Sequence, residues 1–174
     1  MKKILIFVFS VAAALVLVSC ANKQTETAEP TVGMANPWEE TDAEGFVQKS
    51  GLDLNVPEGA ENVIYRVLTD EKLGEIQFTL NGNEYTARVK GAAEFEDLSG
   101  IYVTWDSTED VEVSYCSGKL MSGKNGDETV QCVEWFDVVP GVMYSLSTSG
   151  KDLSGLDITA VAEQVFKPMQ GNAE

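Results

Sequence analysis

The chain of 174 residues contains no histidine, and this absence excludes several kinds of chemistry. Histidine is the commonest general base and the commonest metal ligand in proteins. A Ser-His-Asp or Cys-His catalytic arrangement is therefore excluded. Zinc sites built from histidine and cysteine are also disfavoured, because the only cysteines are Cys20, Cys116 and Cys132. We expect no catalytic residue, no metal site and no cofactor.

Basic residues are scarce: the chain has 12 Lys and Arg residues against 28 Asp and Glu residues, for a net charge of -16. Binding to nucleic acid relies on clustered basic side chains that neutralise phosphates, so we expect no nucleic-acid partner. The first 19 residues hold two lysines and no acidic residue, which leaves the rest of the chain more negative still. Such a body is repelled by anionic lipids, and attachment to a membrane would have to come from a lipid anchor.

Long apolar runs are absent except at the N-terminus, where Lys2 and Lys3 precede apolar and small residues from Ile4 to Val18. This run has 15 residues, whereas a transmembrane helix needs about 20. It ends in Ser19-Cys20, and a small residue before this cysteine fits the cleavage site of a lipoprotein signal peptide. We predict cleavage before Cys20 and acylation of Cys20, which places the protein on the extracytoplasmic face of the cell membrane. An ordinary secretory signal and an uncleaved anchor are the alternatives.

This interpretation divides the chain into a signal peptide at 1–19, a lipidated cysteine with a flexible tether at 20–33, and a single extracytoplasmic domain at 34–174. The tether, ANKQTETAEPTVG after Cys20, contains almost nothing apolar. A flexible chain of this length has a root-mean-square span of roughly 20 Å. The domain should therefore lie close to the membrane.

The start of the domain carries helix signals. Asn36 suits an N-cap, Pro37 suits the first helical position, and Gly51 suits the left-handed residue that ends a helix. We predict a helix from about Pro37 to Lys49, although Gly45 weakens its interior.

The strongest local signal is Asn81-Gly82, which fits a two-residue type I′ turn between two alternating segments. The register of this hairpin places Phe78 opposite Tyr85 and Ile76 opposite Ala87. One face of the sheet should then be buried and the other solvated.

Alternating patterns and turn-rich gaps predict strands at 63–68, 76–80, 101–106, 112–120, 130–137 and 142–148. A closing helix should start after Asp152 or Ser154 and end before Pro168. The fold expected is α+β, with a twisted antiparallel sheet of about five to seven strands and the N- and C-terminal helices packed on one face.

Cys116 and Cys132 lie on either side of the turn-forming segment 122–127. An antiparallel pairing centred on Lys124 would place the two directly opposite each other, and an exported protein lies where disulfides persist. We predict a cross-strand disulfide, which would contribute about 3 kcal/mol in the chain-entropy model. Two separate buried thiols are the alternative.

Two further groups of residues have both a structural and a functional interpretation. The first group is acidic and could hold calcium; it comprises Asp106, Glu109 and Asp110 near one expected turn and Asp127-Glu128 in another. No EF-hand spacing is present, so a solvated acidic surface is favoured. The aromatic residues could form a platform for carbohydrate or peptide, but core packing is favoured because most lie in alternating strands; they are Trp38, Tyr65, Phe78, Tyr85, Tyr102, Trp105, Tyr115, Trp135, Phe136 and Tyr144.

Three segments resemble small lipoproteins of gut Clostridia-type Firmicutes: Gly33 to Trp38, Val133 to Leu146, and Leu153 to Gly171. These lipoproteins carry an extracytoplasmic domain of unknown function, related to domains in anti-sigma-factor-like membrane proteins. The resemblance implies a lipid-anchored extracytoplasmic domain and brings no catalytic residues with it.

The function expected is that of a non-enzymatic, membrane-anchored lipoprotein whose domain binds a protein, a peptide or an envelope component. A sensory or regulatory accessory of a membrane complex is the first alternative. An envelope hydrolase that uses two carboxylates is the second, and it predicts a cleft that contains one acid with a raised pKa.

Overall fold

The computed structural model describes residues 36–169, which form one antiparallel sheet of eight strands with two short helices. The elements, in chain order, are β1 (Glu39–Thr41), α1 (Ala43–Ser50), β2 (Glu61–Leu68), the 3-10 turn η1 (Thr69–Glu71), β3 (Leu73–Leu80), β4 (Asn83–Gly91), β5 (Trp105–Val113), β6 (Cys116–Asn125), β7 (Glu128–Asp137), β8 (Val142–Gly150) and α2 (Ile158–Val165). The predicted α+β class with an antiparallel sheet is confirmed, and the sheet is richer in strands than the five to seven expected.

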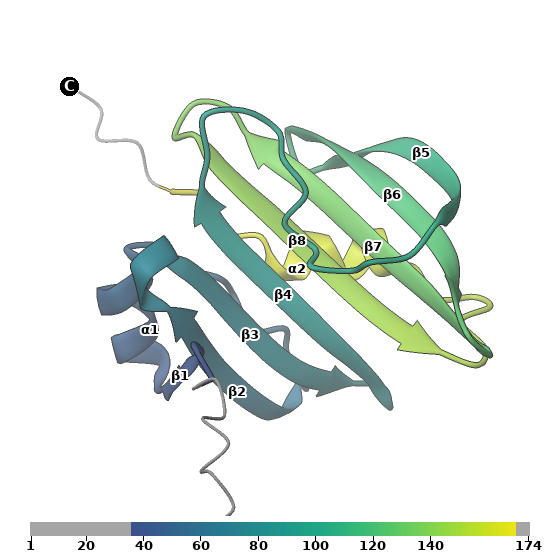
Figure 1. Cartoon of the computed structure of the whole chain (residues 1–174), viewed down its shortest axis with the longest axis horizontal. Helices are drawn as coiled ribbons and strands as arrows, with labels where there is room; N and C mark the ends of the chain where they lie inside the picture. The colour runs from purple at the N-terminus through teal and green to yellow at the C-terminus, as the bar shows by residue number, and fades with distance from the viewer. Residues whose placement is uncertain (1–35, 170–174) are drawn as a thin grey trace, which may run out of the picture. The chain divides into compact units, whose positions relative to one another are not determined.

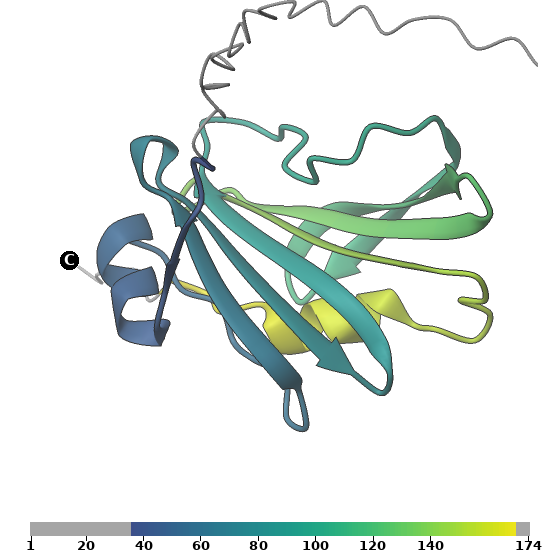
Figure 2. The same ribbon diagram turned by 60° about the horizontal axis from the view of Figure 1, so that its bottom comes forward.

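The strand order is β1-β2-β3-β4-β8-β7-β6-β5 (Figure 1). Two runs of four strands therefore meet where β4 pairs with β8. The connection between them, residues 92–104, has no regular secondary structure and crosses one face of the sheet. We call this segment the strap. Figure 2 shows the strap on one side of the sheet and both helices on the other.

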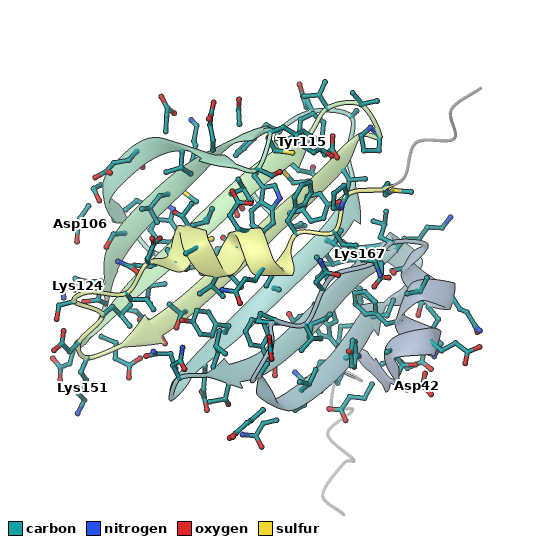
Figure 3. The ribbon with its side chains drawn as sticks, turned by 180° about the vertical axis from the view of Figure 1, so that it is seen from behind. Asp42, Asp106, Tyr115, Lys124, Lys151 and Lys167 are labelled. Carbon is teal, nitrogen blue, oxygen red and sulfur yellow. The ribbon has the colours of Figure 1, made fainter. Side chains whose placement is uncertain are left out.

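The face opposite the strap, which we call the helix face, carries the main core. Phe46 of α1 and Ile158, Val161, Ala162 and Val165 of α2 belong to one buried cluster with side chains of β2, β3, β4, β7 and β8. Figure 3 shows α2 lying across this face. Gly74 of β3 allows α1 to approach closely, because a Cβ atom there would lie 2.5 Å from the ring of Phe46. Both helices therefore pack on the same face.

The β3–β4 hairpin has the predicted register, with Phe78 opposite Tyr85 and Ile76 opposite Ala87. Asn81 and Gly82 have φ values of 52° and 81°, which is the left-handed conformation that a type I′ turn requires at both positions. The rings of Phe78 and Tyr85 stack with their centroids 5.2 Å apart. This local prediction is confirmed.

The predicted helix from Pro37 to Lys49 is wrong at its start. Glu39 to Thr41 instead form β1, which pairs with the end of β2. The helix begins after Asp42, whose carboxylate accepts a hydrogen bond of 2.8 Å from the backbone N–H of Gly45. The predicted stop is confirmed, because Gly51 is left-handed with a φ of 75°.

Two predicted strands are also misplaced. Segment 101–104 belongs to the strap, and β5 begins at Trp105. The predicted strand 112–120 contains a turn, because Ser114 has a φ of 56° and Val113 pairs with Cys116. The closing helix is capped by Asp157 rather than by Asp152 or Ser154, which form a turn of their own.

The predicted disulfide is wrong, and both Cys116 and Cys132 are buried free thiols. The pairing of β6 with β7 places Met121 opposite Cys132, so the turn is Gly126-Asp127 and not a turn centred on Lys124. Cys116 belongs to the cluster on the helix face. Cys132 alternates with Val133 of that cluster and therefore points to the strap face. The sheet itself separates the two sulfur atoms.

Candidate functional site

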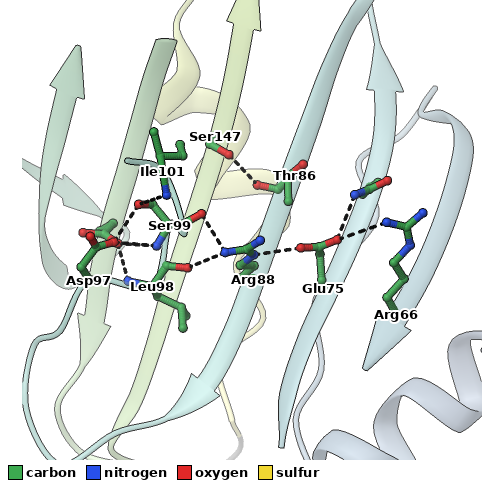
Figure 4. A network of polar contacts seen from close by, with 11 residues as sticks. Arg66, Glu75, Thr86, Arg88, Asp97, Leu98, Ser99, Ile101 and Ser147 are labelled. Carbon is green, nitrogen blue, oxygen red and sulfur yellow. Dashed lines mark hydrogen bonds and ion pairs between the residues drawn. The ribbon is translucent and has the colours of Figure 1, made fainter. Parts of the chain in front are cut away.

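The strap is held to the sheet by two charged side chains that bond to its backbone. The Arg88 Nη1 donates to the carbonyl oxygens of Leu98 and Ser99, at 3.3 and 2.8 Å. The Glu134 Oε1 accepts from the backbone N–H groups of the same two residues, at 2.7 and 3.0 Å. Figure 4 shows the Arg88 side of this arrangement. We call these four residues the clasp.

The charge of Arg88 is balanced from the side away from the strap. Its Nε donates to Glu75 Oε2 at 2.9 Å, and its guanidinium carbon lies 5.6 Å from the centre of the Trp38 ring. Glu75 is buried, and its other oxygen accepts from Gln77 Nε2 at 2.9 Å (Figure 4). Buried ionised groups persist when they are paired and hydrogen-bonded in this way. The clasp is therefore a satisfied polar network.

Gly100 follows the clasp directly and has a φ of 64°. A Cβ atom at this position would overlap the guanidinium group of Arg88. Glycine is therefore needed here for two reasons, the left-handed backbone and the close approach of Arg88.

Glu134 is the acid with a perturbed pKa in this network. Its pKa is raised to about 7, chiefly by burial; the hydrogen bonds from the backbone amides of Leu98 and Ser99 lower the pKa, and the neighbouring Asp97 carboxylate raises it. The side chain is only 3% exposed. Glu134 thus lies beneath the strap and holds it, and it does not face open solvent.

Beyond the clasp, the strap and the sheet form an open cavity of about 470 Å³. This volume lies within the range of about 300–1,000 Å³ that is usual for small-molecule sites. The strap supplies one wall and strands β4, β8, β7 and β6 supply the floor; the lining residues are Glu84, Thr86, Gly100, Ile101, Tyr102, Val103, Asn125, Val130, Ser147, Thr148 and Ser149.

Small hydroxyl groups dominate the floor of the cavity. Thr86 is the register partner of Ser147, and Val130 is the partner of Ser149, so these residues lie side by side on three neighbouring strands. The Ser147 Oγ lies 3.4 Å from the carbonyl oxygen of Thr86 (Figure 4). Among the lining residues, only Glu84 carries an ionised side chain.

Tyr102 stands on the strap wall of the cavity and is 98% exposed. Of the other nine aromatic candidates, four are buried in the core, namely Phe78, Tyr85, Trp135 and Tyr144, and three more pack partly buried against core clusters, namely Trp38, Tyr65 and Phe136. Tyr115 is 64% exposed. The sequence pattern did not separate Tyr102 from these, because the segment 101–106 was predicted to be a strand. The combination of a glycine at 100 and an aromatic residue in a turn-rich segment was the available signal.

The cavity and the start of the described chain lie at opposite ends of the strands. β1 pairs with the end of β2 through Glu39 and Val67, and this row continues through Gly74 and Val89 to Tyr144. Glu84 and Ser149 lie at the other ends of β4 and β8. Figure 3 labels Tyr115, which directly precedes β6, and Lys124, which lies near the end of β6. The cavity residue Asn125 directly follows Lys124, so the cavity lies at the Lys124 end of this strand.

The structure does not bring together the acidic residues that were considered for calcium binding. Asp106, Glu109 and Asp110 lie within β5, an edge strand, and not in a turn. Asp127 lies in the β6–β7 turn and Glu128 starts β7. Within residues 36–169, no group of three or more Cys, Asp and Glu residues is arranged to hold a metal ion.

The predicted lipidation site Cys20, the signal peptide and the tether lie outside the described residues. Neither helix of the described part is long and apolar enough to cross a membrane. No protein-family model matches this chain, and no curated protein and no solved structure is significantly similar to it.

Proposed function

We propose that this protein is a membrane-anchored, extracytoplasmic binding module that is not an enzyme, and that its ligand is a polar envelope component that enters the cavity beneath the strap. The observation that carries this proposal is the cavity of about 470 Å³, which has a hydroxyl-lined floor and a wall held in place by the clasp. Because the strap is already held in position, binding of a ligand does not carry the entropic cost of ordering it.

The hydrolase alternative predicts an acid with a raised pKa inside a cleft. Glu134 has a raised pKa, but it lies under the strap and its Oε1 accepts from two backbone amides. The cavity itself is lined by hydroxyl, amide and apolar groups with one carboxylate, Glu84. One carboxylate is not the pair that the hydrolase needs, whereas the hydroxyl and amide groups are suited to hydrogen bonds with a bound ligand. The binding function therefore has the better support.

The position of the cavity suits a protein anchored at Cys20. The described chain enters the sheet at the end away from Glu84 and Ser149. If the tether joins this end to lipid, the anchor is attached at the strand ends away from the cavity and leaves the cavity open to an envelope component.

Capture from detergent-solubilised membranes with the native lipidated protein tests the proposal. Gly100→Ala should displace the Arg88 guanidinium group and with it the strap wall, because the new Cβ overlaps that group. Gly59→Ala is the matched control, since Gly59 also has a positive φ, 79°, but open space around its Cβ position. One envelope component should be retained by the wild type and by Gly59→Ala and lost by Gly100→Ala.

Equal retention of that component by Gly100→Ala would place its binding site elsewhere and contradict the proposal. Circular dichroism of each variant shows whether the sheet is intact, so that loss of binding is compared only between folded proteins.

A further inference from the structure

We infer that the ligand of the cavity is a neutral saccharide unit, with the exposed ring of Tyr102 stacked on one face of the sugar. This inference rests on the proposed function and names its ligand class. The charge, the hydrogen-bonding groups and the aromatic ring of the cavity support it.

The charge of the cavity disfavours anionic ligands. No Lys or Arg is among the lining residues, and the one ionised side chain is the carboxylate of Glu84. The whole chain has a net charge of -16, so the surrounding field also repels phosphates, carboxylates and nucleotides. A neutral ligand avoids this repulsion.

The hydrogen-bonding groups of the floor match a polyhydroxylated ligand. A Ser or Thr hydroxyl both donates and accepts, as a sugar hydroxyl does, whereas an ammonium group only donates. Thr86 and Ser147 lie opposite each other on neighbouring strands, and Ser149 lies two residues further along β8. Neighbouring strands are about 4.8 Å apart and alternate residues about 7 Å apart, which is a spacing on the scale of a sugar ring. Asn125 adds an amide with both kinds of group.

Tyr102 provides the apolar surface that a sugar ring needs. Its side chain is 98% exposed although it lies on the cavity wall. An aromatic ring combines a flat apolar face with a polar hydroxyl, so it can cover the C–H face of a pyranose while its hydroxyl stays in water. Arg88 and Glu134 hold the backbone of Leu98 and Ser99, and Ile101 N donates to Ser99 Oγ at 3.2 Å, so the backbone leading to Tyr102 is fixed (Figure 4).

Calorimetric titration of the mature lipidated protein in detergent micelles tests this inference. The neutral probes are trisaccharides of glucose, galactose and N-acetylglucosamine. The charged probes are the galacturonate and glucosamine trisaccharides. We expect at least one neutral probe to bind and the galacturonate trisaccharide to bind at least tenfold more weakly.

Variants assign that binding to the cavity. Tyr102→Ala should weaken it about tenfold or more, which is the effect usual for loss of an aromatic stacking partner, and Tyr102→Phe should retain it within about threefold. Thr86→Val removes a floor hydroxyl and should weaken binding in the same way. Val139→Ala is the control, since Val139 is 93% exposed and follows β7 at the opposite end of the sheet.

Each outcome has one meaning. Binding of a neutral probe that Tyr102→Ala and Thr86→Val weaken supports the inference. If no neutral probe binds at about 10 mM, which is about ten times a Kd of 1 mM, the inference is wrong. In that case, capture of an envelope component that depends on Gly100 would still support the proposed function. Failure of the capture experiment and of the titration would contradict both the proposed function and the saccharide inference. A preference for the glucosamine or galacturonate probe would also overturn the neutral assignment.

Discussion

Glu134 is the residue whose charge most directly couples the strap to pH. Its pKa is raised from 4.5 to about 7, chiefly by burial. A carboxyl group of this kind keeps its proton in the folded protein after the unfolded chain has lost it. Its contribution to stability is therefore complete below pH 4.5 and is lost as the pH rises through 7. We expect this group to lower the free energy of unfolding by on the order of 3 kcal/mol across that window.

Glu134→Gln isolates this contribution, because the amide oxygen can still accept from Leu98 and Ser99 while the side chain stays neutral. Urea denaturation of the two proteins should give similar free energies of unfolding near pH 4.5, and the variant should become progressively more stable than the wild type up to pH 8. A parallel pH dependence in both proteins would show that this carboxyl group does not titrate in the folded state as inferred.

At the scale of the element, the packing of α1 on β3 depends on one glycine. A Cβ atom at Gly74 would lie 2.5 Å from the Phe46 ring, whereas one at Gly91 in β4 would have its nearest neighbour 4.0 Å away. We expect Gly74→Ala to reduce the free energy of unfolding by about 1–3 kcal/mol, the usual cost of overpacking a core. Gly91→Ala should change it by about 0.5 kcal/mol or less.

Denaturation followed by the fluorescence of the buried Trp135 measures both variants. A double variant, Gly74→Ala with Phe46→Leu, should show a smaller penalty at position 74 than the wild-type background does, because the ring that the new methyl group meets is gone. Identical penalties in the two backgrounds would rule out this contact as the cause.

The hairpins show why some turns could be predicted and others could not. Asn81-Gly82 carries its turn type in its own residues, since both tolerate a positive φ. Ser114-Tyr115 contains neither glycine nor asparagine, yet Ser114 has a φ of 56° because the pairing of β5 with β6 requires it. A backbone N–H of this turn, that of Ser114, donates to Glu163 of α2. That support is tertiary and has no local signature.

At the scale of the whole molecule, attachment to the membrane is predicted to depend on Cys20. We expect the intact mass of protein purified from membranes to correspond to a chain that begins at Cys20 and carries acyl groups. Cys20→Ala should lack the acyl mass and should not be cut before residue 20, because the cysteine is the recognised and modified residue. Cys116→Ala is the control and should be processed normally. Identical masses of added lipid in the wild type and Cys20→Ala would disprove the anchor.

The sequence by itself determined the features that depend on a few neighbouring residues. These are the β3–β4 hairpin with its register, the stop of α1 at Gly51, the α+β class and the strongly acidic composition. Each of these features follows from local backbone preference or from composition, and none of them depends on which distant strand becomes a neighbour.

Only the tertiary structure decided the strap, the clasp and the cavity. Thr86 and Ser147 meet because β4 pairs with β8, although 61 positions separate them in the chain, and no local pattern specifies that pairing. The tertiary structure also decided the positions of Cys116 and Cys132. The turn at Gly126-Asp127 sets the register of β6 with β7, and in that register the two thiols lie on opposite faces of the sheet. Because side chains in a strand alternate between faces, a shift in register can change which face a residue occupies, and it takes the whole sheet to set that register.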